Sequence, residues 1–369
     1  MENLLLPPVP SRPSGQCSVR GLRAEALGCV RVALVGVGER GRTALRLLSL
    51  LEEARVTVVA DVQRASVEAA ACLLPSGGAV QQLCGESAWA EACRRADVDL
   101  VYVCSDWCSH ALIAVEAMRC GKHVAVEVPA ATTMDELWRL VDTAERTRRH
   151  CFLLENCCYD TDVLRAVERV RRGDIGQVVH AEGAYYHCLG SRWSPWRMDV
   201  NRRLRGDLYP THELGPICMA MDINRSDFLV TLVSMDSAPF SRPDFLNGDH
   251  TTTLLRTRRG ATILLRHDVT TPQPYDRSVH LIGTDGDLHM GEDAADAEAA
   301  CPSFRSAHDP MTYEMNRRLV HQLAHGLPLD FDVYDLATWC AVIPLSRLSI
   351  EHGFMPVAFT PGNCQVTWL

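Results

Sequence analysis

The chain has 369 residues, of which 47% are hydrophobic and 22% charged, and its formal net charge is −9. Two domains are expected at this length, because an average domain has roughly 150 residues. The acidic balance argues against a dedicated nucleic-acid surface or a surface for anionic membranes. No segment approaches the roughly 18 consecutive apolar residues that a membrane span requires.

Sixteen cysteines are scattered along the chain without a Cys-x-x-Cys pair. This spacing is unlike the disulfide framework of a small secreted protein, and it lacks the additional Cys/His pair of a structural zinc site. Residues 1–16 have neither the basic region nor the long apolar segment of a signal peptide. We therefore expect a cytoplasmic protein with reduced thiols and no metal.

The first half of the chain alternates strand-like and helix-like segments, which is typical of a doubly wound parallel sheet. Thr133 and Glu136 predict a capping box for one helix, and Gly121 is expected to end another. The predicted strands are 30–35, 56–61, 98–104, 122–128 and 150–155, and the predicted helices are 42–51, 66–73, 109–120 and 134–148.

The pattern changes near residue 156, where strand-like segments become dominant. Short turns between them, such as the one at 258–260, indicate a largely antiparallel sheet. The acidic stretch 291–300 predicts a surface loop. The predicted strands are 177–187, 229–235, 251–257, 261–268 and 278–283, and the predicted helices are 160–172, 311–325 and 334–352.

The most informative motif, Gly36-Val37-Gly38-Glu39-Arg40-Gly41, lies between a predicted strand and a predicted helix. Glycines at its first, third and sixth positions permit a tight turn, close approach of a pyrophosphate and close helix–strand packing. Asp61 follows the next strand at about the 20-residue distance expected of a ribose-binding acid. A carboxylate there favours NAD over NADP. The alternative is that Asp61 only begins a turn after a buried strand.

Polar or aromatic groups also follow the other predicted strands, at the edge where the ligand of an open α/β sheet lies. Trp107 could flank the nicotinamide or ribose, His110 could donate to a ribose hydroxyl or phosphate, and Glu127 could accept from a ribose or sugar hydroxyl. Each also fits a helix cap or a packed side chain. We predict an N-terminal extension (1–28), an NAD-binding Rossmann domain (29–156) and a C-terminal α+β domain (157–369) with a largely antiparallel open sheet.

A second constellation, Tyr209-Pro210-Thr211-His212, precedes a helix-like segment at 214–221. A histidine at a helix start can be kept neutral and act as a base, and a nearby tyrosine can relay or stabilise a proton. The alternative is that Thr211 caps the helix and His212 is simply exposed. Tyr185, Arg197 and Tyr275 add aromatic and cationic groups suited to a sugar, although such aromatic residues more often serve packing.

With these motifs the chain resembles the Gfo/Idh/MocA oxidoreductase superfamily, and within it the NAD-dependent glycoside hydrolase family 109, the α-N-acetylgalactosaminidase group. The resemblance spans roughly residues 30 to 360. It rests on the glycine motif and on His123-Val-Ala-Val-Glu-Val-Pro129, Leu154-Glu-Asn-Cys-Cys-Tyr159, Ala181-Glu-Gly-Ala-Tyr185, Tyr209-Pro-Thr-His212, Leu214-Gly-Pro216 and His267-Asp-Val-Thr270.

The resemblance implies a redox-assisted elimination and addition, in which tightly held NAD oxidises C3 of the sugar and a base removes the C2 proton. It implies His212 and Tyr209 as the acid/base pair. The implied sugar contacts are Tyr185, Arg197, Tyr209, Pro210, Thr211, His212 and Tyr275. The implied cofactor contacts are Gly36, Gly38, Arg40, Gly41, Asp61, Trp107, His110, Glu127, Val128 and Asn156.

The chain differs from the usual pattern of the superfamily at Val128, which the glycosidase branch shares, and from that of the glycosidase family at Glu213, in a short loop between Tyr185 and Arg197, and at Cys104-Ser105-Asp106 before Trp107. Val128 stands where dehydrogenases of the superfamily usually carry a lysine, and Glu213 stands where the glycosidase family usually has glycine. Two alternatives remain: a conventional NAD-dependent sugar or polyol dehydrogenase, and a non-catalytic NAD-binding regulator. The expected partners are a small-molecule or terminal glycan substrate and further copies of the chain, bound through the C-terminal sheet.

Overall fold

The computed structural model describes residues 4–10, 16–74, 80–290, 304–306 and 308–359, so the predicted acidic loop at 291–300 lies outside the described residues. The chain divides into two compact units. The Rossmann unit comprises Ser11–Asn156 and Ala297–Ala337, and the seven-stranded unit comprises Met1–Pro10, Cys157–Asp296 and Thr338–Leu369. The units interleave along the chain, whereas the predicted domains are consecutive segments. Within the described ranges, no helix has the length and apolar character needed to cross a membrane.

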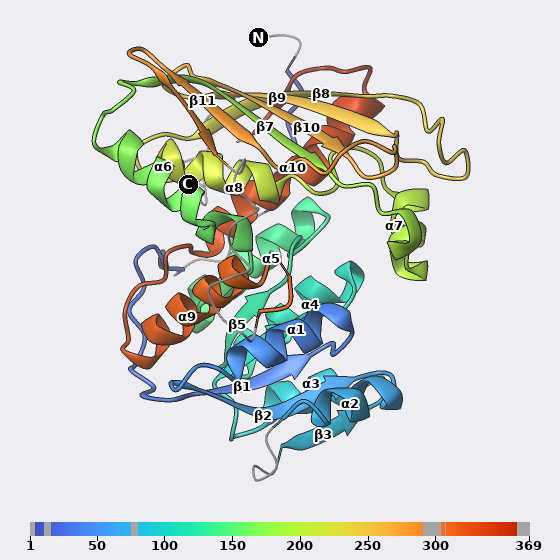
Figure 1. Cartoon of the computed structure of the whole chain (residues 1–369), viewed down its shortest axis with the longest axis vertical. Helices are drawn as coiled ribbons and strands as arrows, with labels where there is room; N and C mark the ends of the chain where they lie inside the picture. The colour runs from blue at the N-terminus through green and yellow to red at the C-terminus, as the bar shows by residue number, and fades with distance from the viewer. Residues whose placement is uncertain (1–3, 11–15, 75–79, 291–303, 307, 360–369) are drawn as a thin grey trace. The chain divides into compact units, whose positions relative to one another are not determined.

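The Rossmann unit contains a six-stranded parallel sheet in the order β3-β2-β1-β4-β5-β6 (Figure 1). This is the strand order of dinucleotide-binding folds. Strands β1 and β4 are almost wholly apolar, as expected for parallel strands buried on both faces. The strands are β1 (Val30–Val35), β2 (Ala54–Asp61), β3 (Gln81–Cys84), β4 (Leu100–Val103), β5 (His123–Val126) and β6 (Cys151–Leu153).

The helices of this unit are α1 (Glu39–Leu48), α2 (Arg64–Ala71), α3 (Ala88–Arg94), α4 (Trp107–Arg119), α5 (Met134–Thr147) and α9 (Asp309–Ala324). The predicted capping box is present at α5, where Thr133 and Glu136 bond reciprocally. After α4, Gly121 adopts a φ of 79°, which suits the glycine expected to end that helix. Helix α9 packs against α1, and an Arg46–Asp309 ion pair of 2.6 Å joins them.

The seven-stranded unit contains a sheet in the order β12-β11-β7-β10-β9-β8-β13. Only the β7–β10 pair is parallel within the described sheet, so the predicted largely antiparallel sheet is confirmed. Its strands are β7 (Val178–Tyr186), β8 (Leu229–Asp236), β9 (His250–Thr257), β10 (Thr262–Asp268), β11 (Val279–Gly283), β12 (Asp287–Met290) and β13 (Val357–Ala358).

Helices α6 (Thr161–Arg171) and α8 (Thr211–Ala220) pack together and against this sheet, α8 on β7 and β11 and α6 on β12. A further helix, α7 (Pro195–Arg203), begins at a serine N-cap, and α10 (Val333–Glu351) begins in the residues of the Rossmann unit and ends in those of the seven-stranded unit. The packing of α8 on β7 decides where the second predicted motif lies.

Candidate functional site

The glycine turn after β1 has the geometry expected for a pyrophosphate. Gly36 has a φ of 84°, and a Cβ there would lie 2.5 Å from the Ser105 nitrogen. A Cβ at Gly41 would lie 2.0 Å from the Gly36 oxygen, so both positions require glycine. A Cβ at Gly38, the N-cap of α1, would meet nothing within 4 Å. The turn is therefore closed on the protein side and open at the helix N-terminus, where an anion binds favourably.

Asp61 at the end of β2 is tied to this turn. Its carboxylate accepts hydrogen bonds from the backbone nitrogens of Val37 and Gln63, each at 2.8 Å. The bond from Gln63 is the contact expected if Asp61 only begins a turn after β2. The bond from Val37 fixes the same carboxylate beside the glycine motif. The two interpretations are thus compatible, and the ribose contact of Asp61 stays a prediction.

Arg40, Glu127 and Asn156 are brought together by a residue that the sequence did not indicate. The Arg40 Nε lies 2.6 Å from Glu127 Oε1, and Thr312 Oγ1 accepts from Arg40 Nη1 at 3.4 Å and from Asn156 Nδ2 at 2.9 Å. Burial alone would lower the pKa of Arg40, but the charge of Glu127, the hydrogen bond to it and the nearby Tyr102 and Cys104 together outweigh burial and raise the pKa. Thr312 lies in α9, far along the chain, so no local pattern could have identified it.

Trp107 and His110 lie in the first turn of α4, which Asp106 caps by accepting from the Ser109 nitrogen. Both side chains are buried. The ring nitrogens of His110 lie 2.8 Å from the Pro129 carbonyl oxygen and 3.0 Å from the Ser105 carbonyl oxygen. His110 therefore joins the loops that follow β4 and β5, and its contact with a cofactor stays a prediction.

Val128 directly follows Glu127 after β5 and is also buried. The position offers an apolar side chain and no group that could transfer a proton. The predicted cofactor residues thus all lie in the Rossmann unit, at the carboxyl ends of its strands or close beyond them, where open α/β sheets bind ligands.

The seven-stranded unit holds a second group of predicted residues, an aromatic cluster around Tyr185 near the end of β7. The Tyr185 ring stacks on that of Tyr209, with centroids 5.1 Å apart and an interplanar angle of 16°. His212 lies edge-on to both rings, at 4.9 Å from Tyr185 and 4.8 Å from Tyr209. Tyr275 is edge-on to Tyr185 at 6.4 Å and is 44% exposed. The cluster thus runs from the buried Tyr185 ring through the half-buried rings of Tyr209 and His212 to the exposed ring of Tyr275.

Two histidines extend this cluster beyond the predicted site residues. The Tyr185 hydroxyl lies 2.6 Å from His187 Nδ1, and the His187 ring is edge-on to Tyr275 at 5.1 Å. His267 on β10 is stacked with Tyr185 at 6.2 Å. Burial raises the pKa of Tyr185 well above its ordinary value and lowers the pKa of His267 to about 4. At neutral pH both side chains are therefore uncharged.

Helix α8 places His212 in this cluster. Pro210 is the N-cap, and Thr211, which is buried, is the first residue of the helix and makes no side-chain cap. The alternative in which Thr211 caps the helix and His212 is merely exposed is therefore wrong, because the imidazole packs against two tyrosine rings.

Glu213 is buried and faces β7, where a Cβ on Gly183 would lie 2.6 Å from the Glu213 Cβ.

Arg197 lies apart from the cluster contacts described above. It belongs to α7, and its guanidinium carbon is 4.5 Å from the centroid of the Trp196 ring. Five of the predicted sugar contacts, Tyr185 and residues 209–212, therefore lie together where α8 begins beside the end of β7. Tyr275 contacts this group through the Tyr185 ring. Arg197 instead contacts the ring of Trp196.

Comparisons with known proteins agree with an NAD-binding Rossmann domain and with a glycosidase-type C-terminal domain. Residues 30–154 match the model of an oxidoreductase family with an NAD-binding Rossmann fold, and residues 189–299 and 297–369 match the C-terminal domain of glycosyl hydrolase 109. Glycosyl hydrolase family 109 proteins of Porphyromonas gingivalis and Bacteroides fragilis are each 39% identical, over 96% of this chain and 89% and 90% of theirs.

Solved structures share the fold. A putative myo-inositol dehydrogenase from Sinorhizobium meliloti has a TM-score of 0.75 and 17% identity, covering 90% of this chain and all of that one. A scyllo-inositol dehydrogenase from Lactobacillus casei, solved with NAD(H) and scyllo-inositol, has a TM-score of 0.74 and 14% identity, covering 90% of this chain and 99% of that one.

Proposed function

The chain belongs to glycosyl hydrolase family 109, and we propose that this NAD-dependent glycosidase cleaves terminal α-N-acetylgalactosamine or a closely related sugar. The observation that carries the proposal is the aromatic cluster of Tyr185, Tyr209 and His212. Tyr185 is buried beneath this cluster, whereas Tyr209 and His212 are partly exposed. The rings of these two residues would contact the C–H face of a sugar, and their phenol and imidazole groups would form hydrogen bonds with its hydroxyls.

The glycine turn and the strand ends of the Rossmann unit fit a dinucleotide, since Gly38 is open at the N-terminus of α1 and Asp61 is fixed beside it. When bound, NAD supplies reversible hydride acceptance at C3 of the sugar, and a ketone there acidifies the C2 proton. Arg40, Glu127 and Asn156, joined through Thr312, would hold the cofactor's sugar end in this proposal.

His212 is the proposed base for the C2 proton. It stands in the first turn of α8, where the positive end of the helix disfavours a second proton on the imidazole, so the neutral form needed by a base is favoured. Tyr209 is the proposed acid partner, because its ring contacts that of His212. The bond between Tyr185 and His187 orients the ring on which Tyr209 stacks.

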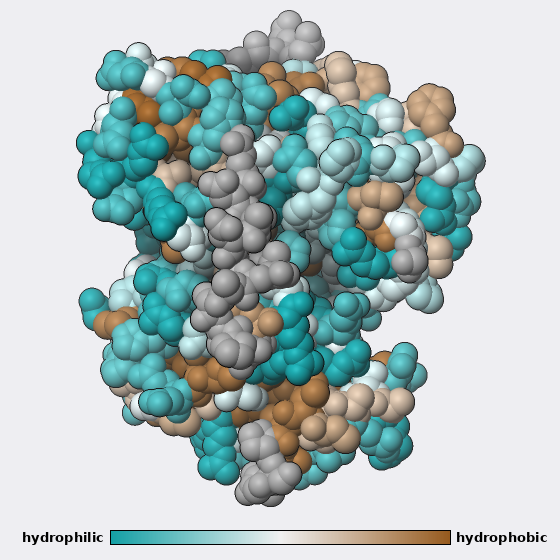
Figure 2. Space-filling model, viewed as in Figure 1, coloured by the Kyte–Doolittle hydropathy of each residue, from teal (hydrophilic) through white to brown (hydrophobic). Residues whose placement is uncertain are grey.

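We also propose that copies of the chain associate through the open face of the seven-stranded sheet. Val233, Leu254 and Leu264 occupy one row across β8, β9 and β10, because Leu254 pairs in register with both of the others. Leu254 is 47% exposed. Figure 2 shows hydrophobic residues along the top of the view, where Figure 1 has the strands of this sheet. Apolar rows of this kind favour self-association.

A cytoplasmic location completes the proposal. Cys17, Cys29, Cys72 and Cys84 are exposed free thiols. Exposed thiols persist in a reducing compartment, whereas oxidising compartments favour disulfides.

The first experiment is release of nitrophenol from 4-nitrophenyl α-N-acetylgalactosaminide by the purified protein, with and without added NAD, while NADH absorbance is followed. We expect release without net NADH. No release, with NADH formed from free sugars or polyols, would replace the glycosidase by a dehydrogenase. Silence in both assays would overturn the proposed sugar specificity.

A further inference from the structure

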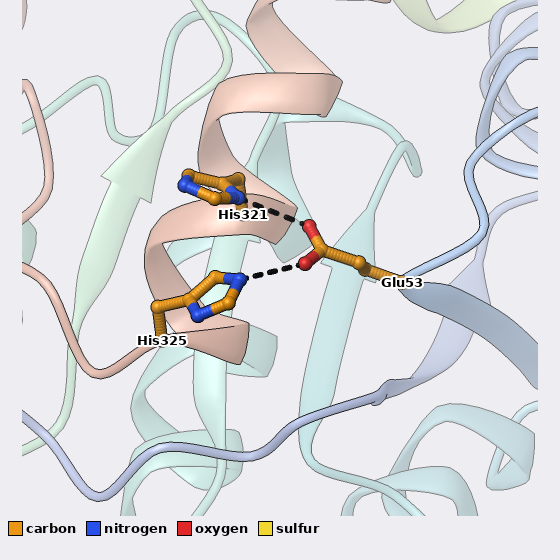
Figure 3. Close-up of side chains that lie close together, drawn as sticks. All are labelled: Glu53, His321 and His325. Carbon is orange, nitrogen blue, oxygen red and sulfur yellow. Dashed lines mark hydrogen bonds and ion pairs between the residues drawn. The ribbon is translucent and has the colours of Figure 1, made fainter.

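The Rossmann unit carries a cluster of potential metal ligands that the proposed reaction does not use. His321 lies in the last turns of α9, His325 is the C-cap of that helix, and Glu53 lies in the turn before β2. Figure 3 shows both imidazoles on one side of the helix with a ring nitrogen directed at the carboxylate. His321 Nδ1 is 3.2 Å from Glu53 Oε2, and His325 Nε2 is 2.7 Å from Glu53 Oε1.

Two imidazoles and one carboxylate are a typical donor set for zinc and similar divalent transition metals. The two histidines are four residues apart on one helix, the spacing that places both side chains on the same face. One ligand atom from each of the three residues lies within 4.8 Å of the others. Donors around a tetrahedral zinc ion with Zn–N bonds of about 2.0–2.1 Å are separated by about 3.3 Å, so only small side-chain rotations are needed.

The backbone around the cluster is fixed. The Leu27 and Gly28 nitrogens donate to the Leu323 and Ala324 carbonyls at the end of α9, and the Val30 nitrogen donates to the Glu53 carbonyl. One short segment therefore holds both the helix end and the turn that carries the carboxylate. A helix C-terminus also favours a nearby cation, because its dipole is negative there. The ligands thus need little ordering before a cation binds.

We propose that Glu53, His321 and His325 bind one divalent transition-metal ion of the zinc class, with water completing the coordination. The side chains of His321 and His325 are 49% and 52% exposed, so an ion can enter and a water ligand can exchange. The bound ion fastens the end of α9 to the start of β2. Because α9 also carries Thr312, this clamp stabilises the helix that contacts Arg40 and Asn156. The site is independent of the proposed glycosidase activity.

The test uses the full chain, treated with EDTA and kept reduced, and titrated with Co²⁺ and Zn²⁺ by calorimetry and absorbance. We expect a Co²⁺ spectrum of nitrogen and oxygen ligands, without the thiolate charge-transfer band that binding at cysteines would give. Zinc at a hundred times its Kd should raise the Tm by about 3–4 °C. His321→Ala should lose both effects, and alanine suits the helix at this exposed position.

The matched control is His289→Ala, in a second exposed cluster with His280 and Asp287 on β11 and β12. It should keep the binding event that His321→Ala removes. Glu53→Gln serves as a second variant if His321→Ala does not fold. Wild-type protein without binding, or binding and a Tm shift that survive both His321→Ala and Glu53→Gln, would overturn the proposal and leave the cluster as an ion pair.

Discussion

The contact between β7 and α8 provides a strict test of how His212 is positioned. In Gly183→Ala the new Cβ would lie 2.6 Å from the Glu213 Cβ and 3.2 Å from both Glu213 Cγ and Ile217 Cδ1. Ordinary contacts of this kind begin at 3.4 Å, so strand and helix must separate by about 1 Å. The residue next to Glu213 is His212, and its imidazole would move with the helix.

Overpacking of this size costs about 1–3 kcal/mol of unfolding free energy. Displacement of the proposed base by about 1 Å should lower kcat by about 10²-fold. Glu213→Gly removes the two Glu213 atoms and leaves only the flexible Ile217 Cδ1 at 3.2 Å, at a cost of about 1 kcal/mol for a glycine inside a helix. In the double variant the two changes should therefore compensate, with a coupling energy of at least about 1 kcal/mol.

Urea denaturation of the four proteins, followed by circular dichroism, measures the coupling, and glycoside turnover measures the displacement. Gly286→Ala is the control, because its Cβ would meet only Ile175 Cγ2 at 3.6 Å, and we expect a change below about 0.5 kcal/mol. Additive effects of Gly183→Ala and Glu213→Gly would refute the argument that this contact sets the position of α8.

Three further predictions concern the same unit. His212→Ala should retain bound NAD while turnover falls by about 10² to 10⁴, whereas His280→Ala should not change turnover; equal activity in both would remove His212 from the mechanism. Burial raises the pKa of Asp207 to about 7, so the folded state holds a proton that the unfolded state has released, and stability should fall as pH rises from about 4 to 7. Asp207→Asn should flatten this fall in urea titrations at several pH values, and an unchanged slope would contradict it. Leu254→Arg should convert the proposed oligomer to smaller species in light scattering, and an unchanged mass would exclude this row from the interface.

Much of the fold could be predicted because its signals are local. The alternation of strands and helices, the capping box at Thr133 and the glycine at 121 all appear within short windows, and the corresponding elements are present. The family could also be identified from the sequence, because its motifs are short and occur in order along the chain. The resemblance is confirmed.

Short elements and long-range contacts were not predictable in the same way. Strands β3, β12 and β13 have two to four residues each, too few for a clear alternation pattern. Helix α7 does carry a start signal, a serine N-cap followed by Pro195, but its arginine-rich sequence lacks the apolar periodicity that predicts a helix, and it is absent from the predicted elements. Thr312 reaches Arg40 across 272 residues, and no local pattern reports such a contact.

The proposed chemistry depends on which residues handle protons. At the end of β5 the chain has buried Val128, so this position offers no amine to take a proton from a sugar hydroxyl. Tyr185 and His267 are kept neutral by burial, and neither is poised to become charged near neutral pH. In the aromatic cluster the imidazoles of His187 and His212 remain. Because His187 is hydrogen-bonded to the Tyr185 hydroxyl, His212 at the start of α8 is our choice of base. Both reactions oxidise a sugar hydroxyl, but only the glycosidase must also remove a C2 proton, and His212 is the group proposed for that step. The placement of His212 at the start of α8 is therefore the part of this arrangement that favours a glycosidase.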